Sequence, residues 1–170
     1  RFALLARRHS MAMPTLEGVF HQRFISTFLR MHPFLSRLGP DLTAQLSSAA
    51  RMATFERNDF PCRQGDVAHE VMLVADGVLK AVRNSPDGRL SVLAYFNTGE
   101  VVGAHDPAQR PYDLTAMGKC QVIFFPKQLF DGLEFQAPEV YARFGKDRMS
   151  RQGAMENAGQ TIFGSAEALL

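Results

Sequence analysis

The chain has 170 residues, of which 46% are hydrophobic, so it is long enough to bury the core of one globular domain with a short remainder for terminal helices. A net charge of only +2 at neutral pH excludes a long-range attraction of the whole molecule to nucleic acid or an anionic membrane. Two cysteines are too few for a disulfide framework or for an iron–sulfur cluster held by four thiolates. No apolar run approaches the roughly 18 residues that span a bilayer. We therefore expect a cytoplasmic protein without a membrane segment.

The N-terminal part predicts a leader followed by two helices. Residues 1–15 are expected to be a leader or a disordered segment, because the first ten residues are basic and free of acidic residues. Apolar residues at helical spacing then predict a helix that ends before Pro33, since proline disfavours helix in the residue before it. These residues are Phe20, Phe24, Ile25, Phe28 and Leu29. A second, short helix is predicted to open at Asp41, which is a good N-cap, with Leu42, Leu46 and Ala49 on one face.

From Met52 onward the pattern changes to short strand-like pieces separated by turn residues. The predicted strands are residues 71–77, 78–84, 89–96, 100–104 and 120–125. The Asp87-Gly88 pair between two of them is a strong hairpin signal. Short strands at this spacing favour an antiparallel sandwich or roll over βαβ units.

The C-terminal part predicts a helix with a contact seam. Strands are expected to stop after Pro126, and a mainly helical stretch opens at Pro138 and continues to Phe163. Heptad spacing over this stretch gives Tyr141, Phe144, Arg148, Arg151, Met155, Ala158 and Ile162. This seam is apolar at both ends and basic in the middle, so residues 137–163 predict a dimerisation helix. The alternative is one helix packed on its own roll, with the arginines solvated.

Four turn motifs together carry a family resemblance. Gly65-Asp66, Asp76-Gly77, Asp87-Gly88 and Gly99-Glu100 follow one another at regular spacing. Their order resembles that in the effector domain of the catabolite-activator and Fnr-type (Crp/Fnr) transcription regulators. The resemblance implies a mainly β fold with flanking helices, an antiparallel double-stranded β-helix or jelly roll of the cyclic-nucleotide-binding type, over residues 16–136. It also implies a homodimer that contacts DNA through a C-terminal winged helix-turn-helix domain, of which residues 164–170 are expected to be the start and the rest is absent from the chain.

The same resemblance implies a ligand cassette after the Gly-Glu turn. In cyclic-nucleotide-binding members, backbone N–H groups and an Arg followed by a hydroxyl residue hold the phosphate, and a Glu after a Gly binds the ribose. The corresponding candidates are Gly99, Glu100, Gly103, Ala104, Arg110 and Pro111. Ala104 stands in place of the ribose-binding Glu, and Pro111 stands in place of the hydroxyl residue. The loss of two polar contacts disfavours cyclic AMP and leaves the small-molecule effector unknown; for Arg110, the alternative is a solvated loop arginine.

Other chemistry has weaker support in the sequence. His69 and His105 are isolated and no His-x-His occurs, so no metal site is predicted. Some members of the family ligate haem, and His105 and Cys62 are the candidates for that alternative. Cys62 is also an alternative redox sensor that burial would make inert, and Cys120 is expected to be a small buried hydrophobe. No G-x-S-x-G, P-loop or G-x-G-x-x-G motif is present, so the protein is not expected to be an enzyme.

These observations predict the sensory and dimerisation part of a transcription regulator, which relays a ligand signal to a DNA-binding domain not present in the chain. The competing class is a stand-alone cyclic-nucleotide-binding-like module that regulates a partner protein and never contacts DNA. Residues C-terminal to Leu170 would separate the two.

Overall fold

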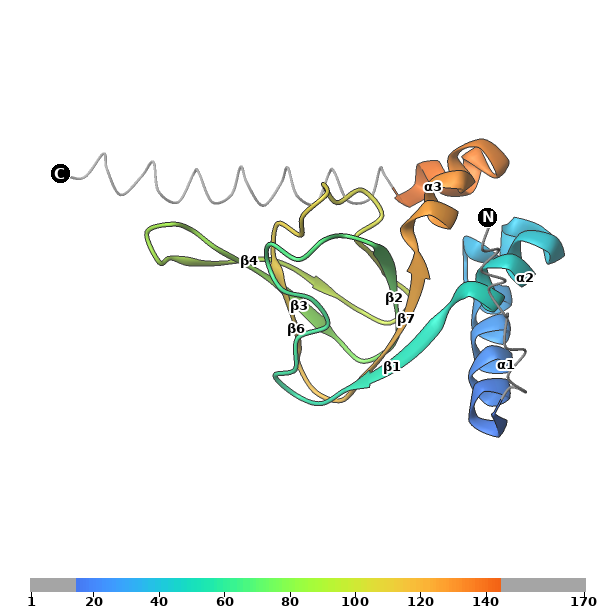
Figure 1. Ribbon diagram of the computed structural model, residues 1–170, viewed down its shortest axis with the longest axis horizontal. Helices are drawn as coiled ribbons and strands as arrows, with labels where there is room; N and C mark the ends of the chain where they lie inside the picture. Colours follow the sequence, from blue (N-terminus) through green and yellow to red (C-terminus); the bar gives the residue numbers. More distant parts are fainter. Residues whose placement is uncertain (1–14, 145–170) are drawn as a thin grey trace, which may run out of the picture.

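The computed structural model describes residues 15–144, which form a β-roll with helices gathered at one side (Figure 1). One sheet has the strand order β1-β7-β2-β5 and the other has the order β4-β3-β6, with every neighbouring pair antiparallel. The strands are β1 (Arg51–Phe55), β2 (Glu70–Asp76), β3 (Leu79–Asn84), β4 (Leu90–Phe96), β5 (Val101–Val102), β6 (Asp113–Ala116) and β7 (Cys120–Pro126). The helices are α1 (Leu16–Met31), the 3-10 helix η1 (Leu35–Leu38), α2 (Gly39–Ala49) and α3 (Lys127–Gln136). The predicted antiparallel roll with flanking helices is confirmed. Among residues 15–144, no helix combines the length and apolar character needed to cross a bilayer.

Helix α1 begins and ends where local chemistry requires. The Thr15 hydroxyl accepts a hydrogen bond from the Gly18 N–H at 3.1 Å and so caps the first turn. The helix ends at Met31, before the His32-Pro33 pair, as predicted. Its buried residues are Ile25 and Leu29. The predicted apolar face is wider than the buried one, because Phe20 and Phe24 are exposed.

Helix α2 starts earlier than predicted. It begins at Gly39, and Asp41 lies in its first turn instead of at the N-cap. Pro40 explains the difference, since its fixed φ suits the first turn of a helix and its missing N–H leaves no helical hydrogen bond unmade. The short helix η1 just before it, which the sequence pattern did not predict, carries the buried Leu35 and Leu38.

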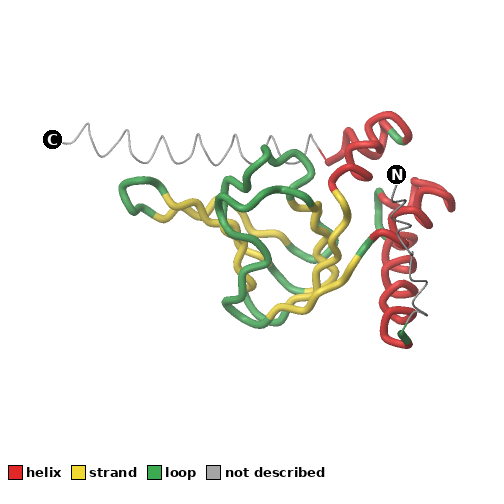
Figure 2. The backbone as a smooth tube through the Cα atoms, in the orientation of Figure 1, coloured by secondary structure: helices red, strands yellow, loops and turns green. Residues whose placement is uncertain are grey.

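Strands β2 and β7 form the centre of the molecule because both of their faces are buried. On one face, Val71 and Leu73 of β2 join Phe125 of β7 in a core shared with the helices. On the other face, Met72 of β2 and Phe124 of β7 belong to a second core, which lies between the two sheets. Strands buried on both faces read as continuous apolar runs, which is why both were recognisable in the sequence. Figure 2 shows these strands between the helices and the second sheet.

The predicted turns are confirmed. The glycines of all four turn motifs have positive φ angles, between 83° and 94°. The Asp87-Gly88 turn joins β3 to β4, with hydrogen bonds from the Ser85 N–H to the Arg89 carbonyl and from the Gly88 N–H to the Ser85 carbonyl, both at 2.9 Å. The resulting hairpin projects from the side of the roll opposite α1 and α2 (Figure 1).

Three strand predictions need correction. Strand β5 is only two residues long, because Gly103 turns the chain with a φ of 87° and ends the extended region predicted over residues 100–104. Strands β1 and β6 were not predicted as separate elements. Strand β6 has the sequence DLTA, in which alternation is too short to stand out.

The helical region after the roll begins earlier than predicted and packs inward. Helix α3 starts at Lys127, directly after β7, and residues 138–144 are also helical. Phe144 is buried, and its ring lies 5.4 Å from that of Phe130 of α3, between ring centroids. The use of Phe144 in a dimer seam is therefore wrong, and at this position the alternative of packing on the chain's own roll is correct. Of the remaining seam, Arg148, Met155 and Ile162 lie outside the described residues, as do the predicted leader up to residue 14 and residues 164–170.

Candidate functional site

The candidate cassette begins at a turn fixed by main-chain hydrogen bonds. The Gly99 N–H donates to the Val74 carbonyl at 2.7 Å, and the Val74 N–H donates to the Glu100 carbonyl at 3.0 Å. The Glu100 carboxylate accepts from the Asn97 N–H at 2.7 Å and so closes its own turn. Gly99 and Glu100 therefore hold the start of the cassette against β2, and Glu100 has a structural role in this turn.

The backbone of Arg110 is hydrogen-bonded to the Gly65-Asp66 turn. Its N–H donates to the Asp66 carbonyl at 2.7 Å, and its own carbonyl accepts from the Gly65 N–H at 2.8 Å. Two isolated bridges, Val67 with Gln109 and Cys62 with Leu114, extend this antiparallel pairing on both sides. The predicted Gly-Asp turn thus positions the predicted anion-binding arginine.

The side chain of Arg110 is buried and fully inside the site. Only 4% of the residue is exposed, so the alternative of a solvated loop arginine is wrong. Its Nη1 donates to Asp106 Oδ2 at 2.8 Å, and its Nη2 donates to the Glu70 carbonyl. The Tyr112 hydroxyl donates to the same Asp106 oxygen at 2.6 Å. One carboxylate oxygen therefore accepts hydrogen bonds from both a guanidinium and a phenol.

Gly103 makes room for this arrangement. A Cβ atom on Gly103 would lie 2.3 Å from Arg110 Nη1 and 3.2 Å from Asp106 Oδ2. No other residue fits there without moving the ion pair, and the positive φ independently favours glycine. Gly103 and Arg110, both candidates from the sequence, are thus brought together by the structure.

The ion pair makes the interior of the site electrostatically neutral. The side chains of Arg110 and Asp106 are only 4% and 7% exposed. A buried charge is tolerated only when it is paired and hydrogen-bonded, and each of these groups supplies that partner for the other. The guanidinium that the resemblance assigns to a ligand anion thus already holds an anion of the chain's own.

The other predicted cassette residues point elsewhere. Ala104 is buried in the core on the helix side and offers the site no polar atom. The Pro111 carbonyl accepts from Arg83 Nε at 3.4 Å, which ties it to the second sheet. Neither residue replaces the polar contact that the cassette lacks at its position.

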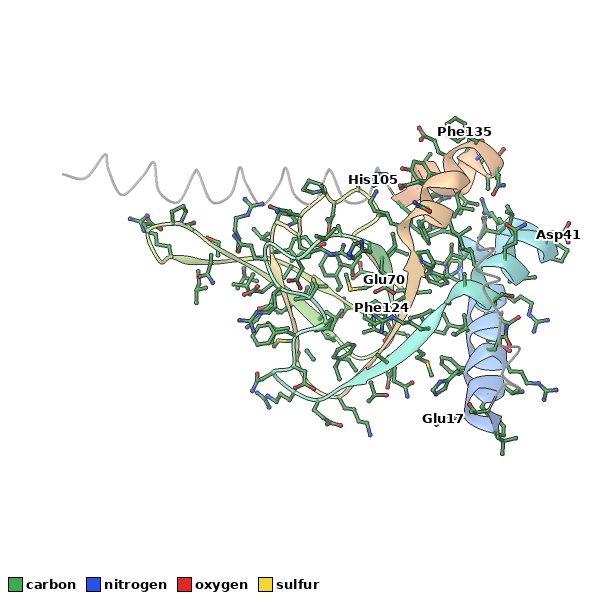
Figure 3. The ribbon with its side chains drawn as sticks, in the orientation of Figure 1. Glu17, Asp41, Glu70, His105, Phe124 and Phe135 are labelled. Carbon is green, nitrogen blue, oxygen red and sulfur yellow. The ribbon has the colours of Figure 1, made fainter. Side chains whose placement is uncertain are left out.

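The two candidates for haem or redox chemistry differ in burial, since His105 is exposed and Cys62 is buried. His105 is exposed, with its ring 5.2 Å from that of Tyr141, and it lies at the surface of the cassette loop (Figure 3). Cys62 is buried, and burial raises the pKa of its thiol to about 11, which keeps it protonated at neutral pH and unreactive. Cys120 is fully buried, as predicted. In the described part of the chain, no group of three or more His, Cys, Asp or Glu side chains is placed to hold a metal ion.

Two residues of the site were missed by sequence reasoning. Asp106 lies four residues before Arg110, a spacing that signals an ion pair only on a helix, and this segment is a loop. Tyr112 follows Pro111, and nothing in the sequence marks its hydroxyl as a donor to Asp106. Both contacts depend on how the loop folds back on the roll.

Comparison with known proteins places this site in a family. The sequence profile of the cyclic nucleotide-binding domain matches residues 52–136, which includes the whole cassette. The chain belongs to this domain family. The resemblance carried by the four turns is confirmed at the level of the domain.

The proteins similar to this chain are varied. Lysophospholipase NTE1 of Phaeosphaeria nodorum is 25% identical over 137 residues, which is 79% of this chain but only 9% of that protein. Among solved structures, the regulatory subunit of a cAMP-independent protein kinase A from Trypanosoma brucei superposes with a TM-score of 0.68 at 20% identity, over 82% of this chain and 52% of that chain. The sensor domain of the transcriptional regulator DNR from Pseudomonas aeruginosa superposes with a TM-score of 0.65 at 19% identity, over 79% of this chain and 93% of that chain. Identities this low establish the fold alone.

Proposed function

We propose that the chain is the effector and dimerisation part of a cytoplasmic transcription regulator of the catabolite-activator and Fnr type, and that it acts without catalysis. The observation that carries this proposal is the buried Arg110, held by main-chain hydrogen bonds inside the ligand cassette of a cyclic nucleotide-binding domain. The ionisable groups of the site pair with one another, as in a binding site, so that none is held ready as a nucleophile or base. The site therefore supports recognition of a ligand.

The cassette also contacts the elements that would relay a signal. At its start, the Gly99 carbonyl lies 2.7 Å from His32 Nε2, just after α1. In its loop, the His105 ring packs edge-on against Tyr141 in the helical residues 138–144. These residues belong to the segment 137–163, which the sequence predicts to be a dimerisation helix. A change in the cassette loop would thus act on the helical segment that leads to the proposed DNA-binding domain.

The similar structures support this role. The chain covers 93% of the sensor domain of DNR, which is itself part of a transcriptional regulator. By contrast, it covers only about half of the kinase regulatory subunit.

Chromatin immunoprecipitation of the full-length gene product tests the proposal. Enrichment at discrete promoter sites is expected. Uniform background along the genome would contradict it.

A second candidate is a regulatory module that binds a partner protein and never contacts DNA. The observation in its favour is that similar domains occur in a kinase regulatory subunit and as a small part of a much larger lysophospholipase. Affinity purification of the full-length product would then recover one partner protein in a stoichiometric amount, and chromatin enrichment would be missing.

A further inference from the structure

We propose that Asp106 is a tethered ligand of Arg110, so that the oxyanion site of the cassette is filled by the chain's own carboxylate and opens only to an oxyanion that displaces it. The inference deepens the proposed function and rests on it for the regulatory meaning of the cassette. It names the class of effector: a small molecule that presents a carboxylate or phosphate group.

The contacts of Asp106 are those that a bound oxyanion would make. Its Oδ2 accepts from Arg110 Nη1 at 2.8 Å and from the Tyr112 hydroxyl at 2.6 Å, inside a site where both charged side chains are less than a tenth exposed. Gly103 has no side chain, which leaves room for the Arg110 guanidinium and the Asp106 carboxylate. Guanidinium and hydroxyl donors on one oxygen are the features that recognise carboxylate or phosphate groups.

The two partners are anchored very differently. Arg110 is held by two short main-chain hydrogen bonds, at 2.7 and 2.8 Å, to the Gly65-Asp66 turn, and by its side chain on the Glu70 carbonyl. The Asp106 N–H makes a longer contact of 3.4 Å with the Gly103 carbonyl. Arg110 is therefore held firmly in position by its backbone, whereas Asp106 is held only weakly by its own.

The loop geometry allows Asp106 to leave without unpacking the core. Its neighbours His105 and Pro107 are both exposed. The chain is held again from Ala108 onward, because the Ala108 carbonyl accepts from the Ala68 N–H at 2.9 Å and Gln109 forms a bridge with Val67. Only the Asp106 side chain of residues 105–107 turns inward. A rotation of residues 105–107 would move the carboxylate out and leave Arg110 and Tyr112 in place for an incoming oxyanion.

The test replaces the built-in ligand by a free one. Asp106→Ala removes the carboxylate and leaves a space of about the size of formate, so sodium formate is the probe. Thermal denaturation is followed while formate replaces chloride at constant ionic strength, because a ligand of the folded state raises the midpoint by mass action. The apparent dissociation constant of Asp106→Ala for formate is expected to be at least about tenfold lower than that of the wild type. This is the effect of one charge-assisted hydrogen bond, which formate makes with Arg110 once Asp106 no longer occupies it.

Three further variants make the result specific. Asp87→Ala is the matched control, since it removes one negative charge from an exposed ion pair with Arg89 and should behave like the wild type. The double variant Asp106→Ala with Arg110→Ala should lose the formate effect. Asp106→Asn keeps the size of the side chain and removes its charge, so the built-in ligand is held less tightly while Arg110 and Tyr112 both remain for formate, and its affinity for formate should lie between those of the wild type and Asp106→Ala.

The proposal is overturned if Asp106→Ala responds to formate no better than the wild type and Asp87→Ala. Should Asp106→Ala fail to fold, Asp106→Asn decides: the same formate affinity as the wild type overturns the proposal, and a higher affinity supports it. The formate titration tests only the pairing of Arg110 with Asp106, and the chromatin experiment tests only the proposed function. Either experiment can therefore fail while the other succeeds.

Discussion

At the scale of single residues, the ion pair of Arg110 and Asp106 dominates the site. Both side chains are almost fully buried, so each neutralises a charge that would otherwise be isolated in a medium of low dielectric. The pair contributes little net stability compared with apolar packing, but its partial removal is costly. This asymmetry leads to a prediction for the single and double variants.

Asp106→Ala is expected to lower the free energy of unfolding by about 3–5 kcal/mol, because it leaves the Arg110 guanidinium, which the main chain holds in place, buried without its anion. Tyr112→Phe removes one hydrogen bond and should cost about 1 kcal/mol. Urea denaturation measures both. Removing Arg110 and Asp106 together should cost less than removing Asp106 alone, and a larger loss in the double variant would contradict this view of the pair.

Gly103→Ala is expected to destabilise the protein by about 1–3 kcal/mol, the usual cost of forcing atoms into a filled space. The added methyl group would lie 2.3 Å from Arg110 Nη1, at a backbone φ of 87° that disfavours alanine. Gly88→Ala is the matched control, because its φ is also positive but an added methyl group would meet no atom within 4 Å. Equal losses in the two variants by thermal denaturation would show that the close contact is unimportant.

The sequence predicted some residues of the site and not others. Gly103 and Arg110 were predicted because a family resemblance assigns them a place after the Gly-Glu turn. Asp106 and Tyr112 were not, because their contacts arise from a loop conformation that no spacing rule covers. The same limit applies to Ala104, whose burial on the helix side follows from the direction of the chain after Gly103.

At the scale of elements, His32 joins the helices to the cassette. Its Nδ1 accepts from the Phe34 and Leu35 N–H groups at 3.1 Å each, so Nε2 carries the proton and donates to the Gly99 carbonyl at 2.7 Å. Burial lowers the pKa of His32, although the hydrogen bond to Gly99 acts in the opposite direction. The neutral ring is therefore the form that holds these elements together.

The lowered pKa of His32 predicts a pH dependence of stability. The unfolded chain, with a histidine pKa of about 6.5, binds the proton more readily than the folded one. The stabilising contribution of His32 is thus complete above about pH 6.5 and falls as the pH drops toward the lower pKa of the folded state. His32→Gln, which removes the titrating group, should reduce the loss of unfolding free energy that occurs as the pH falls below about 6.5.

The matched control is His69→Gln, since His69 is exposed and takes part in hydrogen bonds through its main chain, to the Val67 carbonyl and from the Lys127 N–H. This variant should keep the pH dependence of the wild type. An unchanged slope in His32→Gln, measured by urea denaturation at a series of pH values, would contradict the role assigned to His32.

Elements with a strong pattern were predictable and weak ones were not. β2 and β7 are continuous apolar runs, and the β3–β4 hairpin carries an Asp-Gly turn. β6 is four residues long and is specified by pairing with β3. α3 was missed because the helical stretch was expected to open only at Pro138, although Pro126 just before a helix is equally compatible with its first turn.

At the scale of the whole molecule, we predict a homodimer through the segment 137–163. Light scattering at tens of micromolar should give about twice the chain mass of 18.9 kDa. Met155→Asp, in the predicted seam, should release monomers, whereas Arg8→Ala should not. Phe144→Asp is not a test of dimerisation, because Phe144 packs on Phe130 and its replacement should unfold the core. A monomer mass for the wild type would contradict the prediction.

Calorimetric titration with cyclic AMP tests most directly whether the cassette is closed to the family's ordinary ligand. The cassette lacks the ribose carboxylate at Ala104 and the hydroxyl at Pro111, and its Arg110 already binds Asp106, so cyclic AMP would have to displace an internal ligand without regaining the missing contacts. We predict very weak binding or none. A dissociation constant in the low micromolar range or tighter, abolished by Arg110→Ala, would contradict this prediction.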